Sequence, residues 1–525
     1  MSTSKQPILL KGGTVILHEP PASGYQSQTT KVPSTAKAAH TTIQWIRGDL
    51  LIIPPRISKI VPCSTDGSSP NLELPPHTRI VDCRDKIVSP GFVDTHHHVW
   101  QTQLKGRHAD EMLQDYFYSG NFTSSIFTPR DVYWGQLGGC LGALDSGTTT
   151  LVDHSHINYS VQHSSNALSA TVASGIRSFF CYCPTPRVKT WAPSFQLEQD
   201  LLPEWVMSQL EELAHHQPFG DGRVRLGFAF DGFYLPEKKI QEIFAKVRGL
   251  GIKLITSHYL RTAVTGNDER PKQMESLGIL KDDILLSHAN QATPNDAQLL
   301  KAAGAFISST PDTELQMGSG EPTCFRPDLQ EISSLGIDCH SNNSSDIMTQ
   351  MRLALQSSRA IRNQRFIEAG KAAKHASPTV EEAFNLGTIQ GARAVRMEDE
   401  IGSLAEGKLA DIVIFDATTP AMVCAAQHDP VAAIVQHASV RDIDTVIVNG
   451  QIRKEGGNLL PIAVESEAAG SETRPDIVKW QDLARELLAS RSRIQEQIEQ
   501  LDFDVARQGT LKSFYIDENN LVETI

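Results

Sequence analysis

The sequence lacks long apolar runs and paired cysteines, and each absence excludes a class of protein. No stretch approaches the length of a membrane-spanning helix, and the apolar run Ile8–Leu10 is too short for a signal peptide. The eight cysteines contain no Cys-x-x-Cys pair and are too sparse for a disulfide scaffold, which is typical of a reducing compartment. We therefore expect a cytoplasmic protein with no membrane partner.

Basic surface and phosphate-binding motifs are missing as well. A formal net charge of −13 leaves no basic footprint for nucleic acid, so no nucleic-acid partner is expected. No Gly-x-Gly-x-x-Gly motif follows an apolar run, which argues against a nucleotide-binding fold. What remains is a chain of 525 residues, 40% hydrophobic, which is long enough to bury a large core in more than one domain. A small-molecule substrate is the expected partner.

Apolar runs alternate with amphipathic segments through the middle of the chain. Helical patterns separate most of these runs, for example residues 294–303, where Thr293 would cap the first turn. Eight strands alternating with helices over about 300 residues favour an α/β fold, a (β/α)8 TIM barrel, over a doubly wound sheet. The predicted strands are Ile87–Thr95, Thr148–Asp153, Ser178–Cys183, Arg225–Phe230, Lys253–Ser257, Ile284–Ser287, Ala305–Ser309 and Leu335–Cys339.

The regions flanking the barrel contain short strand patterns and one long helical pattern. We predict that residues 89–395 form the barrel and that residues 1–88 and 396–460 together form a small β-sandwich domain, because chain ends often lie close together. Residues 461–525 are predicted to be a helical tail with apolar residues at helical spacing. This tail would pack on its own chain or, alternatively, on a second subunit in a homodimer.

Five side chains of types that bind metals lie at the ends of predicted strands. His96 and His98 form a His-x-His pair, and because side chains alternate along a strand, both point to the same side. His258, His288 and Asp338 end three other strands. A single such histidine is usually a hydrogen-bonded core residue, and that alternative stays open for each. All five together, at the strand ends where barrel enzymes carry their chemistry, favour one divalent metal ion, Zn²⁺ or alternatively Fe²⁺ or Mn²⁺.

These residues give the chain a resemblance to the amidohydrolase superfamily, in particular to its cytosine deaminase and triazine chlorohydrolase-like branch. The resemblance covers roughly residues 8–455. It rests on the segments Ser-Pro-Gly-Phe-Val-Asp-Thr-His-His-His (89–98), Gly-Thr-Thr-Thr-Leu-Val-Asp (147–153), Gly-Ile-Asp-Cys-His-Ser-Asn (336–342) and Gly-Ser-Leu-Ala-Glu-Gly-Lys-Leu-Ala-Asp (402–411), together with His258 and His288.

The resemblance implies a metal-dependent hydrolase that cleaves a carbon–nitrogen bond other than a peptide bond, in a cyclic amide, an amidine or an amino-heterocycle. It implies that Asp338 acts as general base and that His288 lies beside the reacting water. Binuclear members carry a lysine at the end of the fourth strand, and residues 225–231 contain none, which favours a single metal ion. The implied metal ligands are His96, His98, His258 and Asp338.

One position departs from the family pattern. Deaminases of this branch carry a glutamate three residues after the histidine of the fifth strand, and here that position is Arg261. Because a guanidinium does not deprotonate in proteins, Arg261 cannot shuttle a proton; it would bind an acidic group of the substrate or, alternatively, form a salt bridge. Glu314 is a candidate replacement acid, and Asp312 competes with it. Further candidates for substrate contact, with structural packing as the alternative, are Trp100, Gln101, His156 and His340.

Two other functions stay open at this point. The same mononuclear site would also serve a dehalogenating hydrolase or a lyase. A barrel without catalysis would be a binding scaffold, although a scaffold has no need of five converging metal-binding groups.

Overall fold

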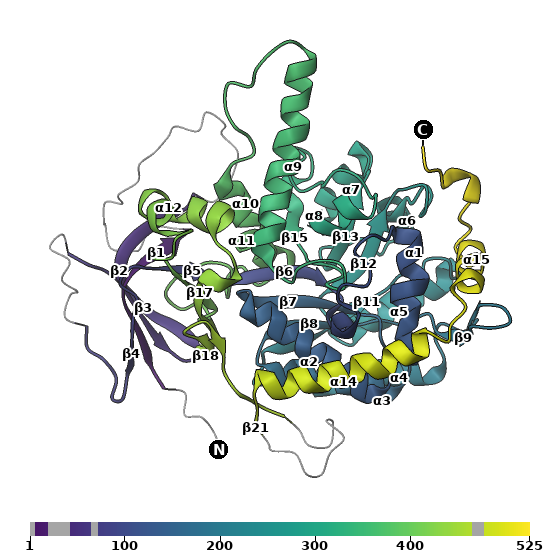
Figure 1. The fold of residues 1–525 in the computed structure, drawn as a ribbon, viewed down its shortest axis with the longest axis horizontal. Coiled ribbons are helices and arrows are strands. Elements are labelled where there is room, and N and C mark those ends of the chain that lie inside the picture. The colour runs from purple at the N-terminus through teal and green to yellow at the C-terminus, as the bar shows by residue number, and fades with distance from the viewer. Residues whose placement is uncertain (1–5, 19–41, 65–71, 465–476, 525) are drawn as a thin grey trace. The chain divides into compact units, whose positions relative to one another are not determined.

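The chain divides into two compact units in the computed structural model, which describes all residues except 1–5, 19–41, 65–71, 465–476 and 525 (Figure 1). One unit comprises Met1–Asp94, Ala143–Thr150 and Asp346–Leu460, and the other comprises Thr95–Gly142, Leu151–Ser345 and Pro461–Ile525. The domain boundaries expected from the sequence stay a prediction. Among the described residues, no helix combines the length and the hydropathy needed to cross a bilayer.

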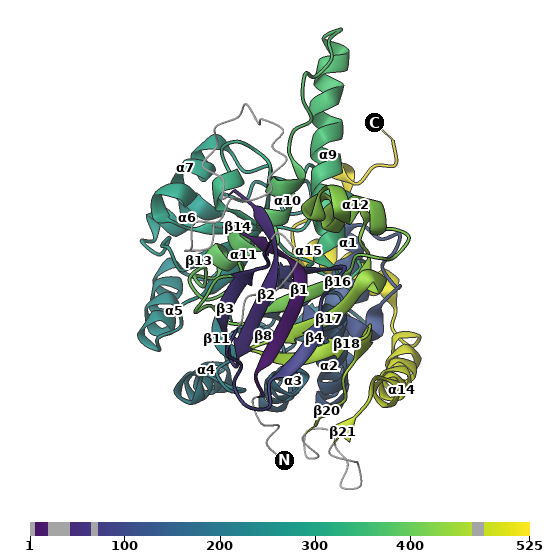
Figure 2. The same ribbon diagram turned by 90° about the vertical axis from the view of Figure 1, so that its left-hand side faces the viewer.

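The first unit contains a nine-stranded sheet built from both parts of the chain (Figure 2). The N-terminal and C-terminal parts meet where β5 pairs with β16 in antiparallel register. Whether this sheet belongs to a β-sandwich stays a prediction. Its strands are β1 (Ile8–Leu17), β2 (Gln44–Ile53), β3 (Arg56–Pro62), β4 (Arg79–Asp82), β5 (Lys86–Pro90), β16 (Ile412–Asp416), β17 (Ile443–Val448), β18 (Gln451–Glu455) and β19 (Asn458–Leu459).

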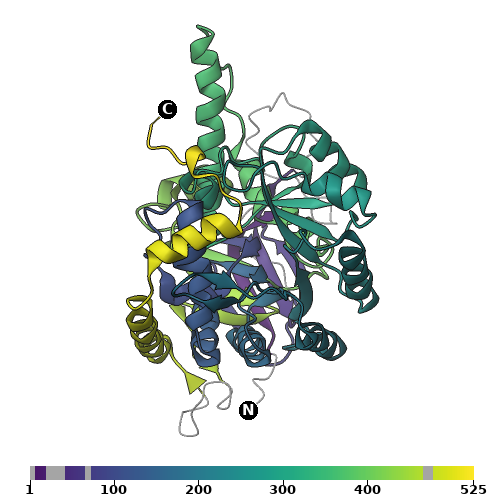
Figure 3. The ribbon, with the colours of Figure 1, turned by 90° about the vertical axis from the view of Figure 1, so that its right-hand side faces the viewer.

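The predicted (β/α)8 barrel is confirmed. Its eight strands neighbour one another in sequence order, and a parallel bridge between His97 and Asp338 joins the first strand to the residues after the last. In Figure 3 the blue to teal helices surround these strands. The strands are β6 (Phe92–His97), β7 (Thr148–Ser155), β8 (Arg177–Tyr182), β11 (Val224–Ala229), β12 (Ile255–Leu260), β13 (Ile284–Asn290), β14 (Phe306–Ser309) and β15 (Ser333–Leu335).

Two predicted strands differ from the observed ones by more than their limits. The run 87–95 is divided at Gly91, whose backbone N–H bonds to the carbonyl of Asp411 and where a Cβ atom would lie 2.1 Å from Thr149 Oγ1. The part before Gly91 is β5 of the nine-stranded sheet, and the part after it begins the barrel. The last strand ends at Leu335 instead of Cys339, since Asp338 has a φ of 65° and leaves the extended conformation.

Helices and short strands connect these elements. Helix α7 begins at Pro294 as predicted, with Thr293 and Asp296 forming a capping box. The helices are α1 (Leu113–Tyr116), α2 (Pro129–Asp145), α3 (Val161–Ser174), α4 (Glu204–His216), α5 (Glu237–Gly249), α6 (Arg270–Ser276), α7 (Pro294–Ala303), α8 (Pro311–Gln316), α9 (Ile347–Glu368), α10 (Val380–Leu386), α11 (Ile389–Ala394), α12 (Val423–His428), α13 (Pro430–Ala432), α14 (Trp480–Ile498) and α15 (Phe503–Ser513). The short strands are β9 (Val188–Thr190), β10 (Gln196–Leu197), β20 (Ile462–Ala463) and β21 (Ile477–Val478).

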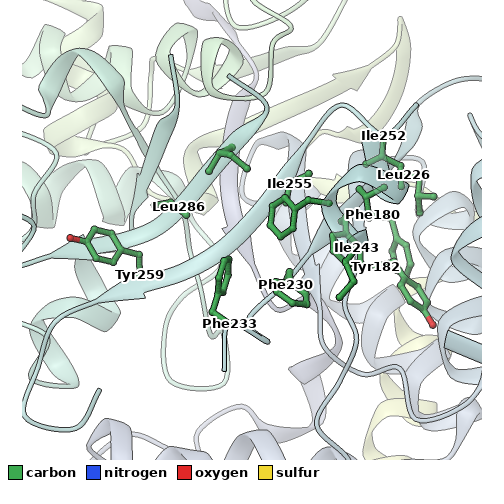
Figure 4. Close-up of a cluster of buried hydrophobic side chains, with 14 of the residues drawn as sticks. Phe180, Tyr182, Leu226, Phe230, Phe233, Ile243, Ile252, Ile255, Tyr259 and Leu286 are labelled. Atoms are coloured by element: carbon green, nitrogen blue, oxygen red, sulfur yellow. The ribbon is translucent and has the colours of Figure 1, made fainter. Parts of the chain in front are cut away.

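The core of the second unit is aromatic and aliphatic. Phe180, Phe230, Ile255 and Leu286 come from or follow four neighbouring strands and belong to one buried cluster (Figure 4). Each fully buried side chain of this size contributes roughly 1.5–3 kcal/mol relative to an exposed one, so the cluster is the main apolar support of the strand ends.

The C-terminal tail packs on the second unit, to which it belongs. Leu483, Leu487 and Ile494 of α14 are buried, whereas Leu488 is 65% exposed. Asp131 of α2 accepts hydrogen bonds from Ser490 and Arg493 of α14. Packing of the tail within its own chain is thus observed, and the homodimer stays a prediction.

Candidate metal centre

The four predicted metal ligands converge at one end of the barrel strands. The Nε2 atoms of His96 and His98 each lie 3.1 Å from Asp338 Oδ1. The Nε2 atom of His258 lies 3.3 Å from that of His98. One ligand atom from each of the four residues falls within 4.8 Å of the others, so a single ion would reach all of them.

The opposite side of each imidazole ring is held by a separate partner. His98 donates Nδ1–H to the backbone carbonyl of His154 at 3.0 Å, and His258 Nδ1 lies 2.8 Å from a carboxylate oxygen of Asp231. The Nδ1 atom of His96 lies 2.8 Å from the hydroxyl of Ser287. Partners of this kind fix the ring tautomer and leave the Nε2 lone pair directed at the centre of the cluster.

This arrangement fits a divalent metal ion. Three pairs of these ligand atoms lie 3.1–3.3 Å apart and all four lie within 4.8 Å of one another, an arrangement that positive charge between them would stabilise. Zinc bonds of about 2.0–2.1 Å in a tetrahedral site would place neighbouring ligands about 3.3 Å apart, close to these distances. Three imidazoles and one carboxylate are also the kind of donor set that zinc and similar ions prefer.

His288 completes the cluster from β13. Its ring centroid lies 5.3 Å from that of His96, and its Nδ1 atom lies 2.8 Å from the hydroxyl of Thr310. Burial lowers the pKa of His288 to about 4, so the ring is neutral at physiological pH. Both His288 and Asp338 have positive φ values, 74° and 65°, a strained backbone that is concentrated at functional sites.

Asp338 is held as a carboxylate. Burial alone would raise its pKa, but its contacts to His96 and His98 outweigh burial and keep the pKa well below the usual range. As the only carboxylate among the four grouped residues, Asp338 is the candidate to accept a proton from a neighbouring water.

Glu314 lies behind His288, in α8. Its Oε1 atom is 4.0 Å from His288 Nδ1, and it accepts hydrogen bonds from the backbone of Thr310 at 2.7 Å and from the hydroxyl of Ser309. Burial raises the pKa of Glu314 to about 8, so the carboxyl group is largely protonated at neutral pH. Its role as the replacement acid stays a prediction.

The predicted substrate contacts fall into two groups. His156 lies beside the cluster, with its ring centroid 4.0 Å from that of His98 and 5.7 Å from that of Trp100. Gln101 donates to the hydroxyl of Tyr116, whereas His340 bonds to His97 at 2.6 Å on the other side of the strand. The structure therefore brings Trp100 and His156 to the cluster and places His340 with His97.

Arg261 forms an ion pair at the end of β12. Its guanidinium lies 3.5 Å from Asp296 Oδ2 and also contacts Asn267. These contacts fit the salt-bridge alternative, and binding of a substrate anion by Arg261 stays a prediction.

Three further polar residues at strand ends were not assigned a metal-related role from the sequence. Asp231 follows β11 and contacts both His258 and His154 through Oδ2, at 2.8 and 3.2 Å. Cys183 follows β8, and its Sγ atom is 3.6 Å from His154 Nε2. Asp231 is a polar residue directly after the apolar run 226–230, the same signal that identified His258 and His288.

Comparison with known proteins places the chain in a family. The model of the amidohydrolase family matches residues 87–453. The chain is 26% identical over 401 residues to a 5-methylthioadenosine/S-adenosylhomocysteine deaminase of Acetivibrio thermocellus, covering 74% of this chain and 85% of that protein. It is 25% identical over 434 residues to a 5′-deoxyadenosine deaminase of Methanobrevibacter smithii, covering 80% and 91%.

Solved structures show the same fold. A zinc-bound adenosine deaminase from Xanthomonas campestris matches with a TM-score of 0.70 and 18% identity, covering 94% of this chain and 99% of that one. An atrazine chlorohydrolase from Arthrobacter aurescens, complexed with zinc, matches with a TM-score of 0.69 and 19% identity, covering 92% and 100%.

The chain belongs to the amidohydrolase family. The predicted class is thereby confirmed: a metal-dependent hydrolase that acts on carbon–nitrogen bonds, other than peptide bonds, of small molecules. The family assignment does not favour the scaffold, lyase or dehalogenase alternatives.

Proposed function

We propose that the protein is a zinc-dependent amidohydrolase that releases ammonia from an aminated heterocycle. One zinc ion would be held by His96, His98, His258 and Asp338. The observation that carries this proposal is the convergence of their donor atoms at 3.1–3.3 Å, with each imidazole anchored on its far side. Deamination is the activity named for both curated relatives, and a cyclic amide or an amidine is the second choice of substrate.

The residues of the chain divide the proton transfers between them. When bound, a divalent ion would supply the Lewis acidity that lowers the pKa of water and polarises the substrate. Asp338 accepts the proton of the attacking water and later gives a proton to the departing amine. With the Thr310 hydroxyl at Nδ1, His288 directs Nε2–H toward the charge that develops on the substrate and stabilises it.

Glu314 replaces the missing glutamate as proton donor in this proposal. It is largely protonated at neutral pH and lies 4.0 Å from His288 Nδ1. Thr310 contacts both groups, His288 through its hydroxyl and Glu314 through its backbone N–H. A proton given by His288 to the ring nitrogen of the substrate is therefore replaced from Glu314, while the departing amine takes its proton from Asp338. The hydroxyl proton that is lost when the carbonyl forms returns to Glu314 by the same route. Arg261 has no part in the transfer, because its guanidinium remains charged.

The substrate enters from the side of the cluster that is open to solvent. The side chains of Asp231 and His258 are 39% and 28% exposed, whereas those of His98 and Asp338 are at most 5% exposed. Trp100 and His156, whose ring planes meet at 75°, would line the site beside His98 and could contact a planar ring edge to face.

A cytoplasmic location is also proposed. All eight cysteines are free thiols, and seven of them are buried. This pattern is typical of a reducing compartment.

The test combines metal analysis with a screen for ammonia release. Three proteins would be analysed for zinc and assayed on aminated purines, pyrimidines and triazines: the wild type, a His98→Ala variant and a His216→Ala control. The control removes an exposed histidine of α4. We expect His98→Ala to lose about one equivalent of zinc and all ammonia release, and the control to retain both. Equal zinc content in the wild type and in His98→Ala would contradict the proposed site.

A further inference from the structure

A second group of metal-binding side chains lies on the neighbouring strands. His154 is the seventh residue of β7, and Cys183 directly follows β8. Asp231 is the second residue after the end of β11. The strands β7, β8 and β11 are adjacent in the barrel, so the three side chains meet at one place. Their ligand atoms all lie within 4.8 Å of one another.

The two distances from His154 are compatible with a metal site. The Nε2 atom of His154 is 3.6 Å from Cys183 Sγ and 3.2 Å from Asp231 Oδ2. Zinc bonds of about 2.3 Å to sulfur and about 2.0–2.1 Å to nitrogen and oxygen would separate tetrahedral ligands by about 3.3–3.6 Å.

The surroundings give a cation access to this group. His154 is fully buried, and its Nδ1 atom makes no hydrogen bond to any described residue, so its ring contacts Cys183 and Asp231 through Nε2 alone. The carboxylate of Asp231 is 39% exposed, which gives an ion access from solvent and leaves room for water as a fourth ligand.

We propose that His154, Cys183 and Asp231 bind a second divalent ion of the zinc class, separate from the ion in the His96 cluster. A thiolate ligand selects such borderline or soft ions over magnesium or calcium. Binding replaces the S–H bond of Cys183 with a sulfur–metal bond and releases the proton to solvent. Asp231 would then join the two centres, since its Oδ2 atom is also 2.8 Å from His258 Nδ1.

The alternative is a purely hydrogen-bonded chain. In that case His154 donates to Asp231, Asp231 orients His258, and the thiol of Cys183 donates to the carbonyl of Pro184 at 3.5 Å. This alternative requires no second ion and predicts no sulfur at any bound metal, because the His96 cluster offers only nitrogen and oxygen.

Cobalt substitution distinguishes the two arrangements. The metal-free full-length protein would be titrated with Co²⁺ while the sulfur-to-cobalt charge-transfer absorption in the near ultraviolet is recorded. We expect about two equivalents to bind, with the absorption present in the wild type and lost in Cys183→Ser together with about one equivalent. The matched control is Cys181→Ser, a buried thiol two residues earlier on the same face of β8, which should keep the absorption.

A His98→Ala variant separates this proposal from the proposed function. It should lose the other equivalent of Co²⁺ and keep the charge-transfer absorption, because its mutation lies in the first cluster. Zinc X-ray absorption of the wild-type protein supplies a measurement that does not depend on the folding of any variant: a sulfur neighbour at about 2.3 Å supports the second site. Its absence at saturating zinc, or an absorption that survives Cys183→Ser, would overturn the proposal.

Discussion

The two sides of the metal centre differ in how they are built. The closed side, formed by His96, His98 and Asp338, is almost fully buried, and each of its groups is held by fixed partners. The open side, formed by Asp231, His258 and Arg261, has side chains that are 19–39% exposed. The closed side carries three of the four ligands expected of the family, whereas the open side carries the fourth, His258, together with the departure at Arg261. The proposed metal therefore draws its ligands from both sides, whereas the departure from the family pattern lies on the open side alone.

The largest expected effect comes from the closed side. Asp338→Asn keeps the shape of the side chain but removes both a ligand charge and the proposed general base, so kcat/KM should fall by about 10³–10⁴-fold. Steady-state kinetics with ammonia detection measures this loss. Asp504→Asn, an exposed carboxylate of α15, is the control. A decrease below tenfold would show that Asp338 is not the base.

A smaller effect is expected on the open side. Asp231→Asn removes the charged acceptor that holds His258 Nδ1 at 2.8 Å, and metal affinity of the first cluster should fall about 10–100-fold. Competition with a zinc chelator measures the affinity. Cys183→Ser leaves the His258 contact intact, so an equal loss of first-cluster affinity in that variant would contradict the positioning role of Asp231.

Glu314 and Asp338 are both buried carboxyl groups, but the pKa of Glu314 is raised whereas that of Asp338 is lowered. Glu314 therefore provides a prediction about how stability depends on pH. Burial raises the pKa of Glu314 to about 8 from an ordinary value of 4.5, so between these values the folded protein keeps a proton that the unfolded chain releases. The contribution of Glu314 to stability is therefore largest below pH 4.5 and is lost as the pH rises toward 8. Since Gln does not titrate, Glu314→Gln should gain stability relative to the wild type as pH rises, by a few kcal/mol.

Chemical denaturation at about pH 5, 7 and 9 measures this difference, because these values lie below and above the pKa of Glu314 in the folded protein. Glu237→Gln, which changes an exposed residue at the start of α5, should show no such trend. A constant difference between Glu314→Gln and the wild type over the whole range would mean that Glu314 is ionised in the folded protein.

The smallest effect is expected at Arg261. If its ion pair with Asp296 is its main role, Arg261→Ala should lower the free energy of unfolding by about 1 kcal/mol and change KM less than about twofold. Thermal denaturation and substrate titration measure the two quantities. A tenfold or larger rise in KM at unchanged kcat would instead support binding of a substrate anion by Arg261.

The barrel and the first cluster were predictable from sequence because they depend on local pattern. Apolar runs ending in His96, His98, His258 and His288 identify both the strands and the chemistry at their ends. The strand limits were less accurate, since the division at Gly91 and the positive φ of Asp338 depend on contacts with distant residues.

The second group of ligands could not be predicted with the same reasoning. Cys183 lies two residues after Cys181 in an apolar run, and a buried cysteine is normally a core residue. Only the pairing of β7, β8 and β11 brings it to His154 and Asp231. Likewise, the contact of Glu314 with Thr310 becomes visible only when α8 is placed after β14.

An anomalous difference map at the zinc edge tests the central claim most directly. Crystals grown with zinc should show a strong peak enclosed by the Nε2 atoms of His96, His98 and His258 and by Asp338. This result would establish these four residues as the metal centre of the hydrolase. A well-ordered map without a peak among these four residues would contradict the account.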